Sequence, residues 1–157
     1  MNFYQSLKGI TSLSKMKLDL KEFWPLINET IVSGGEFRLF HKGTSMMPLL
    51  RQGIDSVLLV SPTDLEKNDI VLYERPSGQL VMHRIVKLRK NKLLICGDNQ
   101  YILEKGITKE NMLAKVKGIY RGEEYFDITN KEYRKYVRKL PLRRFKIKLF
   151  YALGIYK

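Results

Sequence analysis

Cysteine and histidine are scarce in this sequence. The only cysteine among the 157 residues is Cys96, which excludes an internal disulfide and gives no sign of an oxidising compartment. There are two histidines and no Cys-x-x-Cys pair, so the sequence offers no zinc-binding pattern. We therefore predict neither a metal nor a cofactor.

Long apolar runs are missing as well. No stretch approaches the roughly 18 apolar residues of a membrane-spanning helix. Residues 1–23 lack both the apolar core and the Ala-x-Ala-like end of a signal peptide. These features predict a cytoplasmic protein, and peripheral contact with a membrane stays open as an alternative.

Acidic residues are few near the C-terminus. The net charge is +13, and residues 131–157 hold ten Lys or Arg against one acid, Glu132. Pro141 is expected to break the helix in this segment or to start a second one. Four apolar residues recur there at helical spacing and predict a basic amphipathic helix: Leu142, Phe145, Leu149 and Leu153.

Two interpretations of this basic segment stay open. One places residues 140–157 on an anionic membrane surface. The other packs them on the domain with their basic face in solvent. A nucleic-acid partner is not favoured, because it would rest on this tail alone. The sequence does not indicate an oligomeric state.

The chain divides into three segments with different patterns. Residues 1–35 form an N-terminal extension, with no clear period over 1–17 and a helix over 18–32 that Pro25 starts or bends. Residues 36–129 are rich in strand patterns, and residues 130–157 form the helical tail. Alternating or apolar runs predict strands at 36–40, 56–60, 69–73, 79–88, 92–96, 113–121 and 124–128. We predict a mainly β fold, an antiparallel sheet that is coiled or closed into a barrel.

Four short motifs follow one another within the β-rich segment. Residues 43–48 read Gly-Thr-Ser-Met-Met-Pro, residues 69–71 read Asp-Ile-Val, residues 82–84 read Met-His-Arg, and residues 97–99 read Gly-Asp-Asn. In this order and at these spacings they resemble the motifs of signal peptidase I and the LexA-like serine peptidases. Each motif is weak alone, and the four in order are a specific signal.

The resemblance covers residues 36–121 and implies a function. Where the bacterial members carry a lysine as base, this chain has His83, as in the signal peptidases of archaea and the endoplasmic reticulum. The resemblance implies the signal-peptidase-like β fold and a serine endopeptidase. Its substrate would be a leader or precursor peptide with small side chains near the scissile bond, bound in an extended form.

Ser45 and His83 also make chemical sense without the resemblance. A serine hydroxyl becomes a good nucleophile when a base removes its proton, and histidine titrates near neutrality and can then protonate the leaving amine. Strand alternation places His83 on a face with Val81 and Ile85, where desolvation lowers its pKa. His41 is the rival base, and we expect it at the surface or in contact with substrate.

Two acids compete for the role of orienting His83. Asp98 belongs to the Gly-Asp-Asn motif and could complete a triad, but it could equally be a turn aspartate. Relatives of the Ser/His type carry further acids downstream of this motif, where this chain has Glu104. The sequence leaves both acids open.

The residues around Ser45 are candidates for the oxyanion and substrate surface. The Ser45 backbone N–H is the expected first oxyanion donor. Many signal peptidases have a serine two residues before the nucleophile, but Gly43 stands here, so Thr44 or a second backbone N–H is left as the other donor. Met46 and Pro48 are expected to contact substrate, with a core position as the alternative for Met46. If the chemistry is absent, the alternative function is a regulatory or binding module of the same fold.

Overall fold

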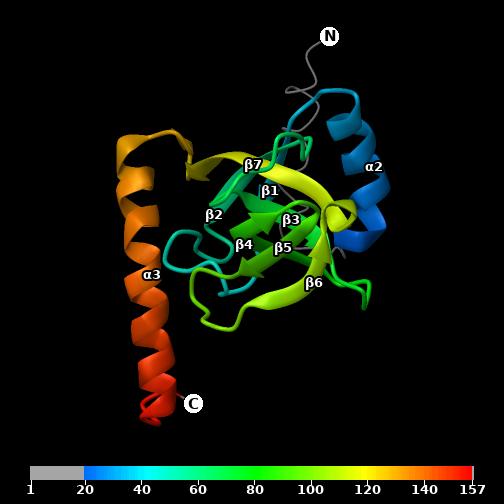
Figure 1. Cartoon of the computed structure of the whole chain (residues 1–157). Helices are drawn as coiled ribbons and strands as arrows, with labels where there is room; N and C mark the ends of the chain where they lie inside the picture. The colour runs from blue at the N-terminus through cyan, green and yellow to red at the C-terminus, as the bar shows by residue number, and fades with distance from the viewer. Residues whose placement is uncertain (1–19, 157) are drawn as a thin grey trace.

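The computed structural model describes residues 20–156 (Figure 1), so the expectations for residues 1–17 and for the first two residues of the N-terminal helix lie outside it. The predicted strands are all present to within one or two residues. The elements in chain order are α2 (Leu20–Val32), β1 (Phe37–Phe40), β2 (Asp55–Val60), β3 (Ile70–Glu74), β4 (Leu80–Arg89), β5 (Lys92–Cys96), β6 (Glu104–Thr108), the 3₁₀ helix η3 (Lys109–Asn111), β7 (Met112–Arg121), β8 (Glu124–Asp127) and α3 (Lys131–Ala152).

The strands form one antiparallel sheet, which confirms the mainly β fold. Their order is β1-β2-β7-β3-β4-β5-β6, and β8 pairs with β7. A barrel requires its two end strands to exchange hydrogen bonds. Within residues 20–156 the end strands β1 and β6 do not pair, so the sheet is open and the barrel alternative is wrong.

β6 is a strand that the sequence pattern did not reveal. Gly106 interrupts its apolar alternation, and its φ of +80° departs from regular strand geometry. The strand forms because it pairs with β5, where Leu93 lies opposite Ile107 and Ile95 lies opposite Glu104. Tertiary pairing therefore places Glu104 at the start of a strand.

The strands β3 and β4 are buried on both faces of the sheet. Strand alternation directs Leu72 and Met82 into one apolar cluster, and Tyr73 and Ile85 into another. α2 covers the first cluster, which we call the helix-side core, and strands β5 and β6 close the second, the strand-side core. Each face of the sheet thus has its own core.

α3 is one continuous helix, so the expectation that Pro141 breaks or restarts it is wrong. Asn130 caps its start, because its side-chain oxygen accepts the N–H of Glu132 at 2.8 Å. A proline inside a helix costs about 3 kcal/mol. Leu140 and Ile147, on either side of Pro141, are buried against the domain and hold both halves in place. α2 likewise runs through Pro25 over its described residues, Leu20–Val32.

α3 lies beside the sheet, on the side away from α2 (Figure 1). None of the helices within residues 20–156 combines the length and the apolar content that crossing a membrane requires.

Candidate active site

Ser45 lies in a tight turn that leads out of β1. Gly43 has a φ of +94°, in the left-handed region where a side chain is strained. Beyond Ser45 the chain turns back, with the N–H of Met47 donating to the oxygen of Thr44 at 3.1 Å. Met46 and the following leucines are buried in the helix-side core and fix the turn, while Ser45 stays half-exposed.

The Gly-Asp-Asn motif packs directly against the backbone of Ser45. The N–H of Asn99 donates to the carbonyl oxygen of Ser45 at 2.8 Å. A Cβ added to Gly97 would lie 2.6 Å from the same oxygen, so only glycine permits this approach. The first and last of the four motifs are therefore brought together by backbone contacts.

His83 lies on β4 and faces the strand-side core, with 2% of its side chain exposed. Its Nδ1 lies 3.1 Å from Oε1 of Glu104 and 3.1 Å from the hydroxyl of Tyr73. Arg75 binds both carboxylate oxygens of Glu104, with its Nε 2.9 Å from Oε2. These four side chains form what we call the His83 cluster.

Burial and charge set the protonation states in the His83 cluster. Desolvation lowers the pKa of His83, against a smaller rise caused by Glu104. Burial opposes ionisation of Glu104, but hydrogen bonds from Arg75 and Tyr73 outweigh it, so the pKa of the Glu104 carboxyl lies below its usual range. At neutral pH the cluster therefore holds a neutral imidazole beside a carboxylate.

The carboxylate selects the imidazole tautomer. An ionised carboxylate only accepts hydrogen bonds, so Glu104 favours the tautomer in which Nδ1 of His83 carries the proton. The same tautomer leaves the lone pair on Nε2. Nε2 is then the atom that could accept a proton from a hydroxyl, the arrangement of a triad base.

The acid that the structure brings to His83 is Glu104, and Asp98 is bound elsewhere. Both carboxylate oxygens of Asp98 accept hydrogen bonds from Arg84, Oδ1 from Nε and Oδ2 from Nη2, each at 2.7 Å. The side chains of Arg84 and Asp98 are fully buried. Of the two alternatives left open by the sequence, the geometry supports Glu104 as the orienting acid.

Two tyrosines and two arginines from α3 surround Asp98, with Nη2 of Arg144 3.8 Å from Oδ1. The hydroxyl of Tyr136 donates to Oδ2 of Asp98 at 3.1 Å, and the hydroxyl of Tyr133 accepts from Nη1 of Arg84 at 2.7 Å. Arg143 donates to the backbone oxygen of Asp98 at 3.2 Å and to Oδ1 of Asn99 at 2.9 Å. We call this set the Arg84 cluster, and it ties α3 to the turn that contacts Ser45.

No hydrogen bond joins the side chains of Ser45 and His83 within residues 20–156. Cys96 pairs with Arg84, the neighbour of His83, and the next residue, Gly97, touches the Ser45 carbonyl. Met46 packs in the helix-side core, whereas His83 faces the strand-side core. The backbone link between the two residues therefore runs through the C-terminal end of β5, which pairs with the middle of β4 beside Gly97.

The rival base, His41, is buried, which corrects the expectation of a surface position. Its side chain is 4% exposed, and its Nε2 has no hydrogen-bond partner among residues 20–156. Burial lowers the pKa of His41. Hydrogen bonding to the backbone of Gly43 raises the pKa by a smaller amount. His41 thus packs at the base of the Ser45 turn.

The remaining predicted site residues fall into two groups. Thr44 and Pro48 are exposed, so they are accessible to a substrate, and Gly43 is half-buried. Met46 is fully buried, so the structure gives it the core position that was its alternative.

The backbone N–H of Ser45 donates no backbone hydrogen bond within the described range, which leaves it available to an oxyanion.

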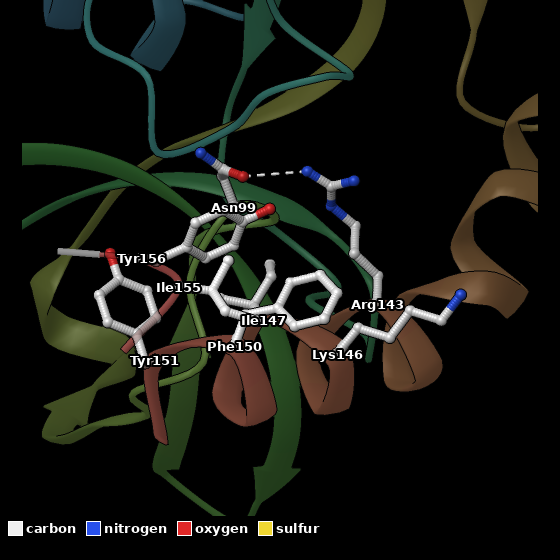
Figure 2. Close-up of a pocket in the computed structure, with 8 residues that line it drawn as sticks. All are labelled: Asn99, Arg143, Lys146, Ile147, Phe150, Tyr151, Ile155 and Tyr156. Carbon is white, nitrogen blue, oxygen red and sulfur yellow. Dashed lines mark hydrogen bonds between the residues drawn. The ribbon is translucent and has the colours of Figure 1, made fainter. Parts of the chain in front are cut away.

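A cavity of about 530 Å³ adjoins the Gly97–Asn99 turn (Figure 2). It lies between this turn and the C-terminal part of α3, and the Arg143–Asn99 hydrogen bond runs along its wall. Neither Ser45 nor His83 lines it. Its lining residues are Asn99, Arg143, Lys146, Ile147, Phe150, Tyr151, Ile155 and Tyr156.

Sequence reasoning missed the tyrosines of these clusters and the arginines other than Arg84. Tyr73 could have been found, because the hairpin register that pairs Val71 with His83 places Tyr73 one step along the same face. Arg75 lies in a turn and Tyr133 in a helix remote in sequence, and no local pattern links either residue to its partner. Within residues 20–156 no group of His, Cys, Asp or Glu is arranged to hold a metal ion.

Comparison with protein-family models and with curated proteins finds no match to this chain.

Proposed function

We propose that this protein is a serine endopeptidase with Ser45 as nucleophile, His83 as general base and Glu104 as the orienting acid. The observation that carries the proposal is the 3.1 Å approach of Glu104 to Nδ1 of a buried His83. This contact supplies the tautomer that a base acting through Nε2 requires, and burial of His83 supplies the lowered pKa.

The reaction follows from the protonation states. Nε2 of His83 takes the proton of Ser45 Oγ as the oxygen bonds to the substrate carbonyl carbon, and the Ser45 N–H donates to the resulting oxyanion. The protonated imidazole then gives this proton to the leaving amine, and an acyl-enzyme remains. Water attacks the acyl-enzyme with His83 as base and releases the second product.

The substrate is an extended peptide of leader or precursor type. β1 is an end strand of the sheet and runs directly into the Ser45 turn. A peptide that added to its free edge by backbone hydrogen bonds would pass Ser45 in an extended form. The free, buried thiol of Cys96 agrees with a reducing, cytoplasmic setting.

The test is cleavage of a peptide library by the wild-type protein and by Ser45→Ala, with products identified by mass spectrometry. Ser61→Ala is the matched control, because Ser61 is also half-exposed but lies outside the site. We expect cleavage by the wild type and by Ser61→Ala, and its loss in Ser45→Ala. Equal cleavage by all three proteins would refute the proposal and favour a binding module of the same fold.

A further inference from the structure

The outer face of α3 carries apolar side chains that the domain does not bury. Leu140 and Ile147 face the domain, and residues two or five positions away from them point to the opposite side of a helix with about 3.6 residues per turn. The outer apolar stripe consists of Leu142, Phe145, Leu149 and Leu153, which are 59, 63, 42 and 63% exposed. α3 is therefore apolar on two opposite faces, and residues 20–156 cover only one of them.

Lysines border the outer apolar stripe on both sides. Helical geometry places Lys139 and Lys146 along one edge and Lys148 along the other, and all three are exposed. The sequence from 133 to 157 contains no acidic residue. The outer face thus combines exposed apolar side chains with positive charge that no acidic residue of the helix beyond Glu132 balances.

This combination distinguishes between the partners that could cover the stripe. A second copy of the chain would bring two strongly basic helices together, and like charges repel. Nucleic acid would engage the lysines through its phosphates but would leave four large apolar side chains in water. An anionic lipid surface offers phosphate groups to the lysines and acyl chains to the stripe.

We propose that the outer face of α3 binds the surface of an anionic lipid bilayer. The stripe enters the boundary between headgroups and acyl chains, and the flanking lysines lie at the level of the phosphates. The inner face of the helix keeps its contacts with the Gly97–Asn99 turn. Binding therefore places the Arg84 cluster within about one helix diameter, roughly 10–12 Å, of the lipid surface.

The experiment is sedimentation of the full-length protein with vesicles of phosphatidylcholine alone or mixed with phosphatidylserine. We expect binding to the mixed vesicles at low salt and weaker binding at high salt, because the screening length falls from about 10 Å at 0.1 M to about 3 Å at 1 M. The neutral vesicles should bind at least tenfold less protein, since each lysine near an anionic surface contributes about fivefold in affinity.

Two variants separate the apolar and electrostatic contributions. Phe145→Ser with Leu149→Ser should weaken binding to the mixed vesicles by about tenfold or more. Lys139→Gln, Lys146→Gln and Lys148→Gln together should weaken it by about a hundredfold. The matched control is Leu26→Ser with Val32→Ser, two similarly exposed apolar residues of α2, which should bind like the wild type.

Circular dichroism and thermal melting of each variant should match the wild type, because the substituted side chains are exposed. Unchanged sedimentation of the Phe145→Ser, Leu149→Ser protein would overturn the proposal. So would a concentration-dependent dimer, seen by analytical ultracentrifugation, that this variant abolishes, because the stripe would then bind a second copy. Neither readout depends on Ser45, so membrane binding and peptidase activity can fail separately.

Discussion

His83 and Arg84 are consecutive residues of β4, but they belong to two buried clusters with different chemistry. His83 meets Glu104 and Tyr73 on one face of the strand, and Arg84 meets Asp98 and Tyr133 on the other. Both clusters contain a cationic or titratable group beside a carboxylate. The difference lies in whether the group can lose its proton near neutral pH.

The protonation chemistry explains why one cluster suits catalysis and the other suits structure. Burial lowers the pKa of His83, which favours the neutral imidazole at neutral pH. Burial acts to lower the pKa of Arg84, but its hydrogen bonds to Asp98 raise the pKa by more, so the guanidinium stays charged. A fixed, bidentate ion pair joins distant segments, whereas the imidazole can exchange a proton during a reaction.

The largest expected effect on activity comes from His83→Gln. Loss of the base should lower kcat/KM for peptide cleavage by about 10⁶-fold, while the protein stays folded because Arg75 still pairs with Glu104. Steady-state kinetics and circular dichroism measure the two outcomes. Substantial remaining activity would remove His83 from the reaction and leave the His83 cluster as a structural feature.

Glu104→Gln should have the next largest effect. An amide no longer selects the tautomer or stabilises the imidazolium, and kcat/KM should fall by about 10⁴-fold. Glu104 raises the pKa of His83, so its removal should shift the acid limb of the kcat/KM profile to lower pH. In the wild type this limb should lie below the ordinary histidine pKa, because burial lowers the pKa of His83. A shift to higher pH would contradict this assignment.

Arg84→Met should affect stability far more than chemistry. It removes the bidentate partner of the buried Asp98 carboxylate and leaves Arg144, 3.8 Å from Oδ1, as the remaining cation. The free energy of unfolding should therefore fall by about 3 kcal/mol in urea titrations. Arg84→Met with Asp98→Leu removes both charges and should recover part of this loss. If the double variant lost more unfolding free energy than the two single variants lose together, the account of an ion pair would fail.

Arg143→Ala should have a smaller effect, limited to the turn that contacts Ser45. We expect kcat/KM to fall by about tenfold, in line with the cost of a lost hydrogen bond to a charged group, with the acid limb unmoved because His83 is untouched. Arg138→Ala is the control, an exposed arginine on the same helix. Equal kinetics of the two variants would show that α3 does not position the turn.

Tyr73→Phe should have the smallest effect. Glu104 already selects the Nδ1–H tautomer, so removing the hydroxyl should change kcat/KM by less than about threefold. If Tyr73→Phe instead matched Glu104→Gln in both rate loss and pH profile, the tyrosine would be the group that sets the tautomer.

The sequence predicted the sheet well because short strands with alternating residues and turn residues between them are local signals. It paired Ser45 with His83 only through the motif resemblance. The pattern could not choose between Asp98 and Glu104, because the choice depends on which face of the sheet each acid reaches. β6, which delivers Glu104, forms by pairing with β5 and has a glycine where alternation would continue.

The path of α3 could not be derived from local pattern either. Pro141 indicated a break, but buried Leu140 and Ile147 hold the helix together from outside the segment. The apolar spacing of Leu142, Phe145 and Leu149 predicts a helical face, and the helix is present, but the structure exposes that face and buries another. Propensity identifies a helix, and tertiary packing decides which side of it faces the domain.

The most direct test of the Ser45–His83 assignment is covalent labelling with a fluorophosphonate, followed by peptide mapping. We expect the wild type and Ser61→Ala to gain one adduct on the peptide that contains Ser45, and we expect no adduct in Ser45→Ala. Labelling of His83→Gln should be slower by several orders of magnitude. An adduct that persists in Ser45→Ala, or a labelling rate that does not change in His83→Gln, would contradict the assignment.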